Sequence, residues 1–167
     1  RNFYFQALKT NEEINQRDGA STNLGNIGAL YYDQKEYNKA LEYLLKALKI
    51  NKELNNKRLE GANLINIGAV YIDQNNLKEA LVYFLDALKI FEDMGGIDGQ
   101  AACLSNIASV YQKQQQYQLA LDYHFKALAI SEKLGAKDYI ASMLGSIGKV
   151  YLDQKKYTEA EKYLLQG

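Results

Sequence analysis

The 167-residue sequence contains no proline and only one cysteine. Because proline breaks helix interiors, its absence suits a chain made almost wholly of helices. The lone Cys103 excludes an internal disulfide and a thiolate metal site, and it fits a reducing compartment. We therefore expect no metal or cofactor and a cytoplasmic location, in a chain whose parent protein could still be attached to a membrane.

The sequence also lacks an excess of either charge. Lysine plus arginine and aspartate plus glutamate each number 20, so the formal net charge is zero and gives no electrostatic case for nucleic acid or an anionic membrane. The apolar runs are far shorter than the roughly 18 residues of a membrane span, and no signal peptide opens the chain. We expect neither a nucleic-acid partner nor a membrane segment in these residues.

One stretch recurs along the chain. Residues 21–55 return without insertions at 61–95, at 101–135 and, shortened, at 141–167. A fixed period of this kind is typical of stacked supersecondary units, each of which buries its apolar face against its neighbour. We divide the chain into the second helix of a preceding repeat (1–20), three repeats (21–60, 61–100 and 101–140) and a truncated repeat (141–167).

Each repeat contains two predicted helices. Leu24, Ile27 and Tyr31 recur at spacings of three and four, which predicts a first helix over about residues 20–33. After a short polar break, Ala40, Leu44 and their neighbours predict a second helix over about residues 37–54. The predicted N-caps of the first helices are Asp18, Asp98 and Asp138. The second helices are predicted to end where residues that adopt the left-handed conformation recur, at Asn15, Asn55, Gly95 and Gly135.

Small residues recur inside the first helix, where glycine costs about 1 kcal/mol relative to alanine. They are Gly28, Gly68, Ala108 and Gly148. We attribute them to close approach of the second helix, whose own small residues are Ala40, Ala80, Ala120 and Ala160.

The recurring columns resemble the tetratricopeptide repeat, whose hallmark is a bulky residue, a Leu-Gly-like pair, a tyrosine, and then alanine, an aromatic residue and alanine. Here these are Leu24, Ile27 with Gly28, Tyr31, Ala40, Leu44 and Ala47. The usual tryptophan is leucine throughout, and the unit is 40 residues long where the ordinary repeat has about 34. The resemblance implies an all-α, right-handed superhelical solenoid of antiparallel helix pairs.

In such arrays the first helices line a concave groove, and this implies a candidate peptide-binding surface. Three asparagines share one column, with a serine in the fourth unit: Asn26, Asn66, Asn106 and Ser146. The charged groove positions are Asp33, Asp73, Lys113 and Lys149. An amide can both donate to and accept from a peptide unit, so the row suits an extended peptide. The charged positions suggest a partner of mixed or mildly basic charge. The alternative is that the amides bond to neighbouring helices or water, and that the charged positions are an ordinary solvated face.

The sequence shows no motif of an enzyme or of a DNA-binding protein that would favour another interpretation. The sequence contains no phosphate loop, dinucleotide fingerprint or nucleophile elbow, and the helix pairs lack the basic recognition helix of a DNA-binding helix-turn-helix. His124, the only histidine, lies 40 residues after Phe84 in a packing column, so we interpret it as a half-buried structural residue. Cys103 is interpreted as a small apolar filler. We predict that these residues form no enzyme.

We therefore expect a scaffold that binds a peptide or protein segment in the concave groove. The alternative is the sensor or dimerisation region of a larger bacterial signalling protein, such as a kinase, cyclase or transcription regulator, with catalysis outside these residues. Both ends of the array lack a polar capping helix, and their apolar flanks favour a homo-oligomer.

Overall fold

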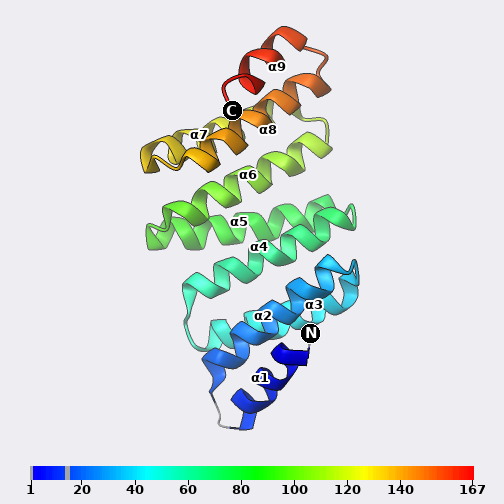
Figure 1. Cartoon of the computed structure of the whole chain (residues 1–167), viewed down its shortest axis with the longest axis vertical. Coiled ribbons are helices and arrows are strands. Elements are labelled where there is room, and N and C mark those ends of the chain that lie inside the picture. The colour runs from blue at the N-terminus through cyan, green and yellow to red at the C-terminus, as the bar shows by residue number, and fades with distance from the viewer. Residues whose placement is uncertain (1, 14–15) are drawn as a thin grey trace. The chain divides into compact units, whose positions relative to one another are not determined.

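The computed structural model describes residues 2–13 and 16–167, and this part of the chain is built from α-helices joined by short turns, with no strand (Figure 1). The helices are α1 (Asn2–Glu13), α2 (Arg17–Asp33), α3 (Tyr37–Glu53), α4 (Lys57–Asp73), α5 (Leu77–Met94), α6 (Ile97–Lys113), α7 (Tyr117–Leu134), α8 (Lys137–Asp153) and α9 (Tyr157–Leu164). Among these described helices, none has the length and apolar character needed to cross a membrane.

The chain forms two compact units, residues 1–90 and 91–167. In unit 1, α2 packs on α1 and α3, α3 packs on α4, and α2 also touches α4. In unit 2, α7 packs on α6 and α8, and α8 packs on α9. Turns of only two or three residues join the packed helices, which requires the partners to run antiparallel. The prediction of an all-α fold made from antiparallel helix pairs is confirmed.

Glycines in the first helices lie directly under large side chains of the second helices. A Cβ atom built at Gly68 would lie 2.6 Å from the Phe84 ring, and one at Gly28 would lie 2.6 Å from Leu44 Cγ. The Gly28 position also faces the Ala40 carbonyl oxygen at 3.2 Å. Close helix approach at the small columns is confirmed, but the nearest neighbour is the bulky residue rather than the alanine.

Tyrosines of the two helices in a pair stack on each other. Tyr31 and Tyr43 have ring centroids 5.4 Å apart and planes inclined by 15°. The pairs at the equivalent positions repeat this geometry and are Tyr71 with Tyr83, Tyr111 with Tyr123, and Tyr151 with Tyr163. Offset stacking of this kind adds to the burial of both rings, so the abundance of tyrosine is explained by packing.

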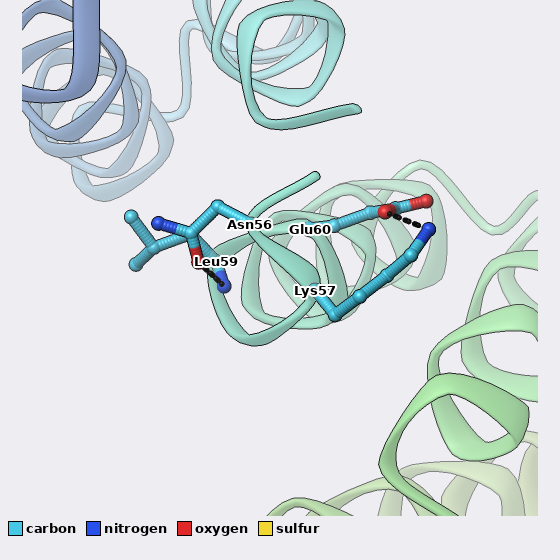
Figure 2. Close-up of polar contacts among 4 residues, drawn as sticks. All are labelled: Asn56, Lys57, Leu59 and Glu60. Atoms are coloured by element: carbon cyan, nitrogen blue, oxygen red, sulfur yellow. Dashed lines mark hydrogen bonds and ion pairs between the residues drawn. The ribbon is translucent and has the colours of Figure 1, made fainter. Parts of the chain in front are cut away.

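The helix starts differ from the sequence prediction. Asp18 lies inside α2 rather than at its N-cap, which is Gln16, and Asp98 and Asp138 likewise lie in the first turns of α6 and α8. The N-cap prediction is therefore wrong, although a carboxylate in the first turn still interacts favourably with the helix dipole. A side-chain cap is formed at α4, where Asn56 Oδ1 accepts from the Leu59 N–H at 3.3 Å (Figure 2).

The ends of the second helices agree with the prediction. Asn55, Gly95 and Gly135 have φ values of 53°, 67° and 64°, in the left-handed region. Asn15 lies outside the described residues. The turns after the first helices also pass through this region, at residues that sequence analysis did not identify: Lys35, Asn75, Gln115 and Lys155.

Candidate functional site

In unit 1 the predicted asparagines lie on the exposed faces of α2 and α4. Burial of Leu24, Ile27 and Tyr31 turns the opposite side of α2, with Asn26, to the solvent. Asn66 is exposed in the same way on α4, which α2 touches directly. No hydrogen bond to another described residue is recorded for either amide side chain. The two amides therefore retain their donors and acceptors.

The two predicted acidic residues of unit 1 differ in their surroundings. Asp33 ends α2 and is exposed. Asp73, at the end of α4, accepts a hydrogen bond from the Tyr32 hydroxyl of α2. Burial, and after it this hydrogen bond, raises the pKa of Tyr32 to about 12. Asp73 thus ties two first helices together, a role that sequence analysis did not identify.

Unit 2 repeats this arrangement with other residues. The Gln112 amide of α6 donates to Asp153 Oδ2 of α8 at 2.6 Å, and these positions lie 80 residues after Tyr32 and Asp73. Asn106 is half-buried on α6, and no hydrogen bond to the described residues is recorded for its side chain. The Ser146 hydroxyl donates to the Ser142 carbonyl of its own helix at 2.9 Å. Ser146 therefore has fewer hydrogen-bonding groups available to a ligand than an asparagine has.

The charge of the exposed face differs between the units. Lys113 and Lys149 are exposed on α6 and α8, and no ion pair with a described residue is recorded for them. Lys113 lies 40 residues after Asp73, so a lysine replaces an aspartate at the end of the first helix, and Lys149 lies 80 residues after Ala69 of α4. The face of unit 1 therefore carries the aspartates Asp33 and Asp73, whereas the face of unit 2 carries Lys113 and Lys149 together with Asp153.

Three hollows of unit 1 lie away from the asparagines. One of about 500 Å³ adjoins the turn between α2 and α3, and one of about 550 Å³ lies by Leu8, Arg17 and Tyr43. A third, of about 460 Å³, lies between α3 and α5. None of these three includes Asn26 or Asn66 in its lining. In unit 1 the two asparagine side chains therefore lie on the open surface of their helices and outside these three hollows.

The remaining candidates for chemistry are core residues. His124 is 1% exposed, deeper than the half-buried position predicted, and both ring nitrogens lack a partner among the described residues. Burial lowers its pKa to about 4. Cys103 is fully buried, as predicted for an apolar filler, and burial raises its pKa to about 12. Residues 2–13 and 16–167 contain no group of three or more His, Cys, Asp or Glu side chains that could hold a metal ion.

Comparison with known proteins identifies a repeat family. The sequence model of the tetratricopeptide repeat matches residues 19–93 and 100–167. No curated protein matches the chain.

Solved structures share the same solenoid fold. BtubC (BKLC) from P. vanneervenii superposes with a TM-score of 0.85 and 21% identity, over 98% of this chain and 68% of that one. The apo form of RapI superposes with a TM-score of 0.85 and 23% identity, over 98% of this chain and 46% of RapI. A Rap protein complexed with competence and sporulation factor superposes with a TM-score of 0.82 and 21% identity, over 96% of this chain and 45% of that protein. The chain spans less than half of the two Rap proteins.

Proposed function

This chain belongs to the tetratricopeptide repeat family, and from that premise we propose that it is an interaction scaffold that holds an extended segment of a partner protein on its first helices. The binding faces in this proposal are those of α2 and α4 in unit 1, and those of α6 and α8 in unit 2. Catalysis has no part in this function.

The observation that carries the proposal is the exposed pair Asn26 and Asn66, whose amides have no recorded partner in the described residues. Asparagine is a poor helix former, because its side chain competes for backbone hydrogen bonds. Its repeated use at mid-helix therefore needs a reason. A ligand main chain supplies one, since each side-chain amide can accept from an N–H and donate to a C=O of the same peptide.

The charged positions narrow the choice of partner. Asp33 favours a basic side chain in the segment that lies on unit 1, whereas Lys113 and Lys149 favour an acidic one on unit 2. A partner segment of mixed charge meets both conditions. The similar Rap protein is complexed with competence and sporulation factor, which supports a binding role for this fold.

We expect Asn66→Ala to weaken binding of peptides selected from a random library on the immobilised chain. Loss of two hydrogen bonds to the ligand backbone should raise the dissociation constant about tenfold or more. Isothermal titration of wild type and variant with the same selected peptide measures this change.

Asn38→Ala is the matched control, because Asn38 is also an exposed asparagine in a helix but lies at the start of α3. The control should bind like the wild type. Equal affinities for Asn66→Ala and the wild type would remove the α4 face from the binding site.

A second candidate function is the sensor or dimerisation region of a larger regulator. The comparison with the Rap proteins favours this candidate, since the segment that is similar to this chain makes up less than half of each Rap protein. The parent reading frame tests it: an adjoining catalytic or DNA-binding region supports this candidate, and a frame of repeats alone contradicts it.

A further inference from the structure

The cleft of about 460 Å³ in unit 1 lies on the second helices, away from the asparagine row. Its residues come from α3, α4 and α5, and the α3 and α5 helices form its two walls. Its volume falls within the roughly 300–1,000 Å³ typical of small-ligand sites. The cleft is thus large enough to hold a side chain from another molecule.

The lining of this cleft is largely apolar. Leu48 and Leu64 are buried beneath it, whereas Leu45 and Val82 are 42% and 57% exposed. Exposed apolar groups that adjoin one another at a hollow are typical of binding sites rather than of an ordinary surface. The cleft therefore offers a favourable place for an apolar group to leave water.

Unit 2 shows which side chain fits at the equivalent place. Phe125 of α7 and Tyr163 of α9 lie 80 residues after Leu45 and Tyr83. The Phe125 ring meets the Tyr163 ring edge to face, with centroids 5.7 Å apart and planes at 66°. The chain therefore places its own aromatic ring between two second helices in unit 2.

The tyrosines that receive this ring are held in the same way in both units. Tyr83 stacks on Tyr71 with centroids 5.4 Å apart, and Tyr163 stacks on Tyr151 at 5.5 Å. Leu45 carries no ring to place against Tyr83. Unit 1 therefore has the aromatic receptor without the ring that occupies it in unit 2.

The charges around the cleft cancel. Lys52 and Lys78 contribute two positive charges, and Glu79 and Asp86 contribute two negative ones. A charged group would gain no net attraction there and would lose its hydration. At position 82 the chain has an exposed valine where unit 2 has Lys162, which extends the apolar wall. The lining is thus complementary to an uncharged ring.

We propose that this cleft binds an aromatic side chain of a partner protein, held edge to face on Tyr83 between α3 and α5. The binding surface is separate from the asparagine row, so one partner segment can occupy each. Phenylalanine in unit 2 defines the ring size that fits.

The first test uses N-acetyl-phenylalanine amide as the probe and the methyl resonances of Leu45, Leu48, Leu64 and Val82 in the whole chain as the readout. Saturable shifts of these methyl groups are expected with this probe, and at least about tenfold weaker binding with N-acetyl-alanine amide, which lacks the ring. Absence of saturable shifts, or equal shifts with both probes, would overturn the proposal.

Two exchanges between the units supply the variants. Leu45→Phe should fill the cleft as Phe125 does and abolish the shift of the Val82 methyl groups, whereas Phe125→Leu should create a second responding site at Leu128 and Leu144. Val82→Lys, which copies Lys162 at the surface, gives an independent way to weaken binding if Leu45→Phe disturbs the fold. Unchanged probe binding in folded Leu45→Phe and Val82→Lys would contradict the assignment.

A second copy of the chain is the other occupant to be distinguished. If it filled the cleft, the Val82 methyl shifts would change with protein concentration in the absence of any probe, and the proposal of a partner protein would be wrong. Concentration-independent shifts support it, as does enrichment of aromatic residues among library peptides that bind wild type but not Leu45→Phe.

Discussion

Gly68→Leu is expected to destabilise unit 1 by about 3 kcal/mol, at the upper end of the range for overpacked cores. The reason is the 2.6 Å between a Cβ atom at position 68 and the Phe84 ring, which is itself fully buried. Neither group can move without separating α4 from α5. Thermal unfolding followed by circular dichroism should show a midpoint lowered by about 10 °C.

Gly145→Ala is the control for this prediction. Gly145 also lies inside a first helix, but a Cβ atom there meets nothing within 4 Å. The substitution should therefore stabilise the chain by up to about 1 kcal/mol through helix propensity alone. If Gly68→Leu unfolded at the wild-type temperature, the glycine column would not be a point of contact between helices.

Acidification is expected to destabilise the chain through His124. The pKa of its imidazole is about 4 in the fold, against an ordinary value of about 6.5. Between these values the unfolded chain binds more protons than the folded one, so stability falls as the pH falls from 6.5 to 4. The loss from this one residue amounts to about 3 kcal/mol at the end of that range.

His124→Leu isolates this contribution from that of the carboxylates, which titrate in the same range. Leucine occupies the equivalent position in α3 and α9, at Leu44 and Leu164. Denaturant unfolding at pH 7 and at pH 4.5 should give a smaller decrease in stability for the variant than for the wild type. Equal decreases would show that His124 is not neutral in the fold.

The positions of most helices could be predicted from the sequence because apolar columns repeat at helical spacing. Turns were predicted where the residue type carries the signal, as at Asn55 and Gly95. Lys35 and Gln115 carry no such signal, since their side chains do not favour positive φ. Packing imposes that conformation, with the Glu36 N–H donating to the Tyr31 carbonyl at 2.9 Å to close the helix end.

In the candidate site, too, some features could be predicted from the sequence and others could not. Exposure of Asn66 follows from the buried stripe on the other side of its helix, so it could be predicted. The hydrogen bond between Tyr32 and Asp73 could not, because it depends on the offset between two neighbouring helices, which a 40-residue spacing does not specify. The cleft between α3 and α5 was missed for a related reason: the separation of two second helices is not specified by that spacing either.

The recorded helix packing within each unit joins neighbours along the chain, or the next helix but one. Within either unit the described residues include no strand, and a force that pulls on that unit meets these local helix contacts. Helices can therefore detach a few at a time, and each repeat that unravels adds up to roughly 140 Å of slack. We therefore expect each unit to unfold under tension in several steps rather than in one.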